Sequence, residues 1–356
     1  MSDALFTTLA TTVESTLADP LAQCRTAAQP LGYVGFDIPL DLLHASGRPF
    51  CHLPWQRNRP TPLADRWLES AFPGWARSLV EDWLSGGFDM FDAVVFTRGD
   101  DAAQRLYYYL CELRRRGIAG GPEPLIFDVA TIRRATSVTH CEHAIRSLLA
   151  RFGVDESALL DGITRANRQR SVFAQLVATR SAAGHIYENI ARASLFRDLL
   201  PVLDGIALTA VAPSRRLLLA GSVPPDDLLH RAVETTGWNV VGESHQLTLA
   251  RHGAPLLDYD RSPVTVLAQH CNAASGGSRD FADRAAGLVT AAQQAAADAV
   301  VLWLTEEDEA LAWHVARQRA ALTQAAVPHL VLTRRRWDGS DNAAAEICRF
   351  LQELPA

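Results

Sequence analysis

Apolar and polar positions follow two alternating rhythms between residues 31 and 134. Short apolar runs bounded by turn residues predict strands, and the segments between them carry apolar side chains at helical spacing. The strand runs are 32–36, 49–53, 93–97 and 125–128, and the helical segments are 39–46 and 102–116. Strands that alternate with helices predict βαβ units and a mostly parallel sheet.

The strand pattern stops from about residue 136 to residue 200. Residues 144–152 have helical spacing, and Gly153 is a suitable end for that helix. Asp155 and Glu156 supply the acidic first turn that favours the start of another helix. This part of the chain is therefore predicted to be a helical insert.

Strand signals return after Pro213. A helix is expected at 228–236, and a second parallel sheet is expected around it. The strand runs of this part are 216–220, 239–242, 264–269, 299–304 and 329–333.

These patterns predict an α/β fold with two Rossmann-like parallel-sheet domains, a helical insert between them and an N-terminal helix. The predicted boundaries are 1–30 for the N-terminal helical segment, 31–135 for the first α/β domain, 136–205 for the insert and 206–356 for the second α/β domain. Two similar halves around a helical piece favour a ligand cleft between them.

Composition limits which kinds of partner the chain is expected to bind and in which compartment it is expected to work. The 356 residues are 48% hydrophobic and 21% charged, with a net charge of −6, and the arginines are scattered among acids. A basic nucleic-acid face is therefore not expected. The N-terminal stretch lacks the basic region of a signal peptide, and no apolar run reaches the roughly 18 residues of a membrane span. The sequence favours a cytoplasmic protein without a membrane or nucleic-acid partner.

The chain contains no lysine. A Walker-type phosphate lysine, a pyridoxal Schiff base and a lysine general base each require an ε-amine. These three classes of chemistry are therefore excluded for the residues of this chain.

The six cysteines are widely spaced and form no C-x-x-C pair, so reduced thiols are expected rather than disulfides or a zinc site. Most are expected to pack as small hydrophobes. Cys51 and Cys271 are the exceptions, because the two thiols could face one cleft, although no third thiol is near to complete a cluster. The predicted strand 264–269 would place Cys271 on a glycine-rich loop before a helix near residue 279. A helix N-terminus lowers a thiol pKa, so Cys271 is a weak candidate nucleophile, or equally an idle cysteine on a flexible loop.

Two strand ends provide further candidates. The segment T-R-G-D-D at 97–101 follows a predicted strand, and parallel strands collect ligands at their carboxyl ends. Gly221 and Ser222 follow another strand and form a weak candidate anion or coenzyme A site, because backbone N–H groups are free at a helix start. An ordinary turn into a helix explains the same pair equally well.

Four segments, taken in order, resemble the 2-hydroxyacyl-CoA dehydratase and class I benzoyl-CoA reductase family, component D type. They are G-Y-V-G-F-D-I-P-L-D-L-L-H-A-S-G-R-P at 32–49, G-V-D-E-S-A-L-L-D-G-I-T-R-A-N-R-Q-R at 153–170, the unit 221–241 with Glu234 and Gly237, and the strand pair within 298–332. The resemblance covers nearly the whole chain.

This resemblance implies a four-iron four-sulfur cluster held by three cysteine thiolates between the two α/β domains. It also implies a coenzyme A thioester substrate and an ATP-hydrolysing activator protein. The family's ligand positions fall near Pro73, Gly99 and Glu306, where this chain has no cysteine. Iron–sulfur clusters require soft sulfur ligands, so no cofactor is expected on this chain.

Three functions follow from this comparison. The first is a clusterless subunit with an acyl-CoA cleft, paired as a heterodimer with a cysteine-bearing paralogous subunit of a lyase or oxidoreductase. The second is a protein that binds acyl-CoA or another small ligand without a redox role. The third is a cluster-independent enzyme with Cys271 as nucleophile, or with Asp100 and Glu306 as acid and base, although such carboxylates are more often helix caps.

Overall fold

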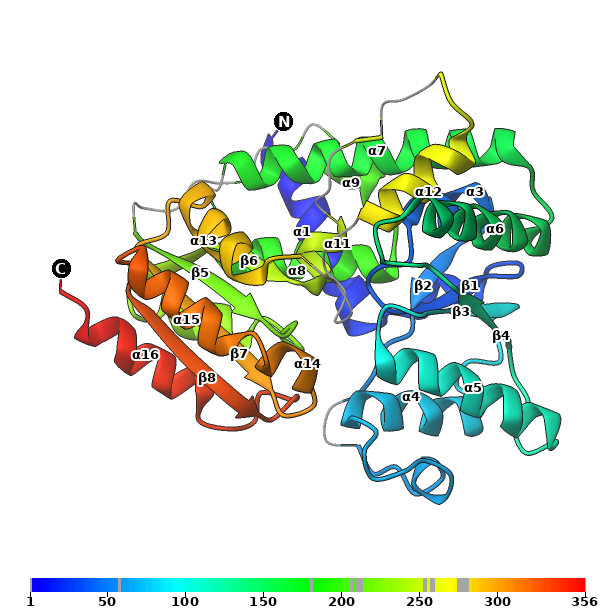
Figure 1. Ribbon diagram of the computed structural model, residues 1–356, viewed down its shortest axis with the longest axis horizontal. Helices are drawn as coiled ribbons and strands as arrows, with labels where there is room; N and C mark the ends of the chain where they lie inside the picture. Colours follow the sequence, from blue (N-terminus) through cyan, green and yellow to red (C-terminus); the bar gives the residue numbers. More distant parts are fainter. Residues whose placement is uncertain are drawn as a thin grey trace.

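The computed structural model describes residues 2–56, 59–179, 182–204, 206, 208, 214–251, 255–256, 260–273 and 282–355. Within these residues the chain forms two four-stranded parallel sheets flanked by helices (Figure 1). The predicted α/β fold class is thereby confirmed.

The first sheet has the strand order β2-β1-β3-β4. Its strands are β1 Leu31–Val34, β2 Phe50–His52, β3 Ala93–Thr97 and β4 Glu123–Phe127. Helices α4 Gly74–Leu84 and α5 Asp101–Arg115 lie on one side of this sheet, and α3 Leu40–Ala45 lies on the other (Figure 1). Neighbouring residues of a strand enter opposite cores: Tyr33 packs with α3, and Val34 packs with α4. Burial on both faces explains why these strands read as continuous apolar runs.

The second sheet repeats the same order, as β6-β5-β7-β8. Its strands are β5 Arg215–Gly221, β6 Trp238–His245, β7 Ala299–Thr305 and β8 His329–Arg335. The helices of this half are α10 Leu228–Glu234, α11 Gln246–Arg251, α13 Arg284–Gln294, α14 Glu309–Ala312, α15 Val315–Gln324 and α16 Ala343–Glu353. The two sheets therefore have the same topology. Parallel sheets usually carry their ligand sites at the carboxyl ends of the strands.

The strand predicted at 264–269 is wrong. These residues belong to helix α12, Pro263–Ala273, which packs against α6, Ala135–Phe152. Its buried side chains include Val264, Leu267, Ala268 and Cys271. Leu267, Ala268 and Cys271 follow Val264 by three, four and seven positions, which places all four side chains on one face of a helix. A short apolar run alone does not distinguish such a helix from a buried strand.

The remaining helices are α1 Ser2–Ala18, α2 Ala22–Arg25, the 3₁₀ turn η1 Ala64–Arg66, α7 Glu156–Thr179, α8 Gly184–Phe196 and α9 Leu200–Leu203. Among them, α8 contacts strands of both sheets. The long helix α7 runs along the top of Figure 1, above both halves. The expected N-terminal helix exists as α1 and packs against α8 and α9. The four domain boundaries stay a prediction.

Helix α8 is tied to both sheets by hydrogen bonds. Asn239 of β6 accepts a bond from the N–H of Gly184 at 2.7 Å, at the start of the helix. The hydroxyl of Tyr33 in β1 donates to the carbonyl of Leu195 at 3.0 Å, near the end of the helix. The helix therefore sets how the second sheet sits against the first.

Two of the sequence segments that carry the family resemblance meet in the interior. Asp41 of α3 forms a buried ion pair with Arg170 of α7. Arg170 also donates to Asn167 Oδ1 at 2.9 Å, and the Asn167 side chain makes two hydrogen bonds with the backbone of Leu256. A Cβ on Gly162 would overlap the carbonyl oxygen of Asp41, so glycine lets α7 approach α3 closely.

Candidate functional site

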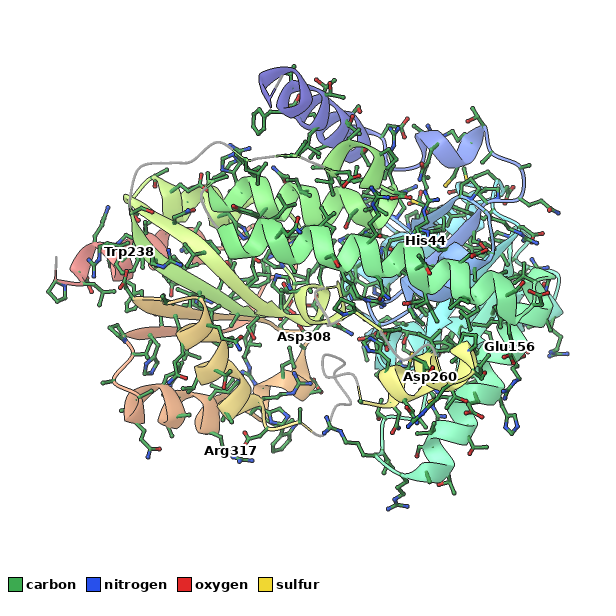
Figure 2. The ribbon with its side chains drawn as sticks, turned by 90° about the horizontal axis from the view of Figure 1, so that it is seen from above. His44, Glu156, Trp238, Asp260, Asp308 and Arg317 are labelled. Atoms are coloured by element: carbon green, nitrogen blue, oxygen red, sulfur yellow. The ribbon has the colours of Figure 1, made fainter. Side chains whose placement is uncertain are left out.

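The carboxyl edges of the two sheets face one another across a cleft with a cavity of about 110 Å³. A larger cavity of about 310 Å³ continues into the second half and shares Asp100, Ser222 and Asp308 with the first. Asp308 lies between the two halves of the molecule in Figure 2. Clefts between domains with apolar walls and a few polar groups are typical ligand sites.

Aromatic rings form one wall of the cleft, on the side of the first sheet. Phe36 stacks on His52 with ring centroids 5.3 Å apart, and Trp55 meets His52 edge-on at 5.6 Å. Trp75, at the start of α4, lies 6.3 Å from Trp55. Ring Nδ1 of His52 lies 3.0 Å from the carbonyl of Leu53, which fixes the proton on that nitrogen. The wall therefore offers flat, mostly apolar surface to a ligand.

Carboxyl groups line the cleft from both halves, with Asp100 after β3 and with Glu307 and Asp308 after β7. Burial, together with the nearby charges of Asp308 and Asp37, raises the pKa of Asp100 to about 6. Burial also raises the pKa of Asp37, Glu307 and Asp308 above their ordinary values. A carboxyl with a raised pKa keeps its proton longer and can donate a hydrogen bond. The Asp100 carboxyl is therefore a hydrogen-bond donor below about pH 6 and an acceptor above it.

Asp100 has a structural role in addition to lining the cleft. It is the N-cap residue of α5, and its Oδ1 accepts a hydrogen bond from the N–H of Ala103 at 2.8 Å. Capping a helix with aspartate is common and needs no catalytic explanation. Glu306, the partner expected for Asp100, is exposed, whereas Glu307 and Asp308 line the cleft. The geometry therefore pairs Asp100 with Asp308 rather than with Glu306.

Ser222 is held inside the same group of side chains. Its N–H donates to the carbonyl of Trp303 at 2.8 Å, and its hydroxyl donates to Asp308. The N–H of Thr305 donates to Ser222 Oγ at 3.0 Å. The backbone N–H of Ser222 is thus engaged within the protein, and α10 begins only at Leu228. The anion site at Gly221 and Ser222 stays a prediction, but it would have to use other groups.

Residues close to the three family ligand positions line this cleft. Pro73 is the N-cap of α4 and comes two residues before Trp75, Gly99 precedes Asp100 at the end of β3, and Glu306 precedes Glu307 after β7. The segment T-R-G-D-D at 97–101 is therefore part of an interdomain site. The assignment of positions 73, 99 and 306 as the family's ligand positions stays a prediction.

Other side chains fill the space at two of these positions. A Cβ on Gly99 would overlap Asp37 Oδ2, and a Cβ on Gly74, next to Pro73, would overlap the indole Nε1 of Trp337. None of the described residues that line the two cavities is a cysteine. Iron–sulfur clusters need thiolate ligands, so these residues do not fit the family's cluster.

Cys271 does not lie in the environment predicted for it. It sits two residues before the end of α12, only 9% exposed, and burial raises its thiol pKa well above the ordinary value. The negative end of a helix dipole disfavours a thiolate further. Cys51 packs in the core on the opposite face of the first sheet, so the two thiols do not converge. The expectation of a reactive loop cysteine is therefore wrong.

Asp37, Glu307, Asp308, Trp75 and Trp337 were missed in the sequence. A usable signal existed for two of them, because Asp37 and Asp308 each lie three residues beyond the end of a strand, β1 and β7. The rule applied to the end of β3 would have found both if it had been applied to every strand. Trp75 and Trp337 gave no signal, because their role depends on how the two halves pack.

Comparisons with known proteins add one family. Residues 36–347 match the family described as 2-hydroxyglutaryl-CoA dehydratase, D-component. No curated protein matches the chain at a significant level. Within the described residues, no helix is long and apolar enough to cross a membrane.

Proposed function

Since the chain belongs to the 2-hydroxyglutaryl-CoA dehydratase D-component family, we propose that it is a clusterless D-component-like subunit whose cleft binds an acyl-CoA thioester. A D-component is by its name one part of a larger system. The partners we propose are a cysteine-bearing paralogous subunit, which would carry the iron–sulfur cluster, and an ATP-hydrolysing activator protein.

The observation that carries the clusterless part of the proposal is the contact between Asp37 and Gly99. Asp37 occupies the space that a side chain at position 99 would need, and its Oδ1 has no hydrogen-bond partner among the described residues. Trp337 fills the corresponding space at Gly74. A carboxylate and an indole thus stand where the resemblance implies thiolates. This arrangement supports a site for an organic ligand rather than for iron.

The aromatic rings and the carboxyl groups of the cleft suit different parts of an acyl thioester. The aromatic wall of Phe36, Trp55 and Trp75 would hold the acyl group by apolar contact. Below about pH 6, where Asp100 is protonated, its carboxyl would donate a hydrogen bond to the thioester carbonyl. Arg284, which lines the larger cavity, would place a guanidinium where a phosphate of coenzyme A can bind. In this arrangement the chain binds and orients the ligand, and the partner supplies the redox chemistry.

Ligand binding is tested by titrating the full chain with a 2-hydroxyacyl-CoA thioester and following tryptophan fluorescence. We expect Trp75→Ala to weaken binding about tenfold, because removing an aromatic contact costs roughly 0.5–1.5 kcal/mol in addition to lost area. Trp313→Ala is the matched control, since Trp313 is 86% exposed and lines neither cavity. Equal affinity for all three proteins, or no binding by the unmodified chain, would contradict an acyl-CoA cleft.

The clusterless part has its own test. The purified chain is reconstituted anaerobically with iron and sulfide, alone and together with a cysteine-bearing paralogue from the same host. We expect stoichiometric iron only with the paralogue, and co-purification of the two chains. Stoichiometric iron and a charge-transfer absorbance with this chain alone would show that it holds a cluster itself.

A second function is favoured by the pairing of Asp100 with Asp308. Two carboxyls with raised pKa values in one cleft are a common arrangement for acid and base catalysis. The chain would then add or remove water on its ligand without a cluster. Turnover of a 2-hydroxyacyl-CoA by the chain alone, abolished in Asp308→Asn, would favour this function over a subunit that depends on its partner.

A further inference from the structure

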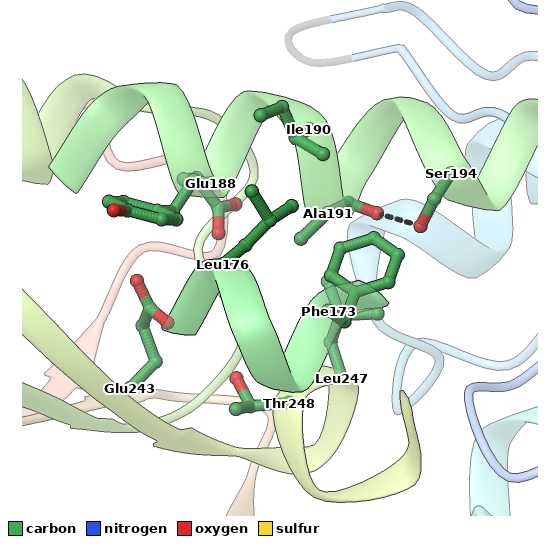
Figure 3. Close-up of a pocket in the computed structure, with 10 residues that line it drawn as sticks. Phe173, Leu176, Glu188, Ile190, Ala191, Ser194, Glu243, Leu247 and Thr248 are labelled. Atoms are coloured by element: carbon green, nitrogen blue, oxygen red, sulfur yellow. Dashed lines mark hydrogen bonds between the residues drawn. The ribbon is translucent and has the colours of Figure 1, made fainter. Parts of the chain in front are cut away.

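A third, much smaller cavity lies away from the cleft, between helices α7 and α8 and strand β6 (Figure 3). Its volume is about 20 Å³, which is room for one water molecule or one ion. Phe173, Leu176, Ile190 and Leu247 give it apolar walls, but two carboxylates also line it. Burying carboxylates among apolar side chains is costly unless a group of opposite charge accompanies them.

The two carboxylates belong to a three-residue cluster. Glu188 of α8, His230 of α10 and Glu243 of β6 each bring a ligand atom within 4.8 Å of the other two. The carboxylates of Glu188 and Glu243 point toward each other across the cavity in Figure 3. The side chain of Glu188 is 1% exposed, that of His230 is 0% exposed and that of Glu243 is 7% exposed. Water therefore does little to stabilise these groups.

His230 is incompletely satisfied in this environment. Its Nε2 lies 3.3 Å from Glu243 Oε1, which is long for a bond to a carboxylate. Its Nδ1 is buried and has no hydrogen-bond partner among the described residues. Two ligands of one tetrahedral ion, each about 2.0–2.2 Å from it, lie about 3.3–3.5 Å apart. The His230–Glu243 separation matches that spacing better than it matches a direct charged hydrogen bond.

The surroundings of the cluster favour a positive charge. Arg192 is paired with Oε1 of Glu188 and also donates to the carbonyl of Pro224 at 2.6 Å, which leaves the carboxylate a second oxygen. Buried carboxylates are costly unless a cation accompanies them. Arg192 supplies one such cation for Glu188, and a metal ion bound with His230 would supply another that both carboxylates share.

We propose that Glu188, His230 and Glu243 hold one divalent transition-metal ion, Mn²⁺ or Zn²⁺, with its open position toward the small cavity. An imidazole ligand favours these ions over Mg²⁺ and Ca²⁺, and the two carboxylates suit both. The ion joins α8 to β6 and α10. Since α8 also bonds to Tyr33 of the first sheet, the ion fixes the position of the two halves on either side of the cleft.

The first measurement is Mn²⁺ binding to the chelator-treated full chain at pH 8, where a proton competes least with the ion, followed by electron paramagnetic resonance and calorimetry. Mn²⁺ is chosen because it binds thiolates weakly, so the six cysteines do not compete. We expect one site per chain, and an affinity at least tenfold lower in Glu243→Gln and in His230→Gln. Glu234→Gln is the matched control, because Glu234 pairs with His185 at 2.7 Å in the same half but outside the cluster.

Thermal unfolding provides a measurement that does not depend on equal folding of the variants. We expect added Mn²⁺ or Zn²⁺ to raise the midpoint of the unmodified chain and of Glu234→Gln by several degrees, and to leave that of Glu243→Gln unchanged. Absence of Mn²⁺ and Zn²⁺ binding by the unmodified chain would overturn the proposal. Equal binding by Glu243→Gln and Glu234→Gln would also overturn it, because the ion would then be held elsewhere.

Discussion

Replacement of Arg170 by methionine is expected to lower the free energy of unfolding by about 3–5 kcal/mol. The substitution keeps a long side chain but removes the cation, and it leaves the carboxylate of Asp41 in a position that is 0% exposed. Asn167, which accepts a hydrogen bond from Arg170, also loses a partner. The change is measured as a shift of the urea midpoint of unfolding, followed by circular dichroism.

The same helix offers a matched control for this prediction. Arg168 of α7 pairs with Asp204, but the two side chains are 64% and 51% exposed. Exposed ion pairs contribute about 0–1 kcal/mol, so Arg168→Met should change the midpoint little. The double variant Asp41→Asn, Arg170→Met should recover part of the loss, because it leaves no unpaired charge. Equal effects of Arg168→Met and Arg170→Met would contradict a stabilising buried pair.

The two sheets could be predicted from the sequence because their strands are buried on both faces. Residues 93–97 and 299–304, for example, are uninterrupted apolar runs, and both became strands, β3 and β7. The run at 264–269, V-T-V-L-A-Q, was also predicted as a strand but became helix α12. Periodicity over so short a stretch does not separate a buried strand from a buried helix. A window extended to Cys271 would have shown the helical spacing.

The candidate site was predicted only in part, because most of it depends on the packing of the two halves. Asp100 follows β3 in the sequence and was found by that position. Its approach to Asp308, far along the chain, is a property of the interdomain cleft. The contact of Asp37 with Gly99 likewise joins the ends of two strands that are distant in sequence. Local patterns along the sequence do not reveal such contacts.

Replacement of Asp100 by asparagine is expected to stabilise the chain at neutral pH and not in acid. Folding raises the pKa of Asp100 from 3.8 to about 6. Between these values the folded state binds more protons than the unfolded state, so the free energy of unfolding falls as pH rises from about 4 to about 6. Above pH 6 the loss is complete. After allowance for partial exposure it is about 1–2 kcal/mol, and the Asp100→Asn variant would avoid it while keeping an efficient helix cap.

The decisive measurement is the difference in urea midpoint between the two proteins at several pH values from 4 to 8. The gain of Asp100→Asn should be near zero at pH 4, grow up to about pH 6 and then stay constant. Asp283→Asn is the control, because Asp283 caps α13 through the N–H groups of Ala285 and Ala286, which lower its pKa. As pH rises, the free energy of unfolding of Asp283→Asn relative to the unmodified chain should stay unchanged or fall. This is the opposite of the change expected for Asp100→Asn. A pH-independent gain in Asp100→Asn would mean that burial in the cleft does not raise the pKa of Asp100, and the hydrogen-bond donor proposed for the thioester carbonyl would then be absent between pH 4 and 6 as well.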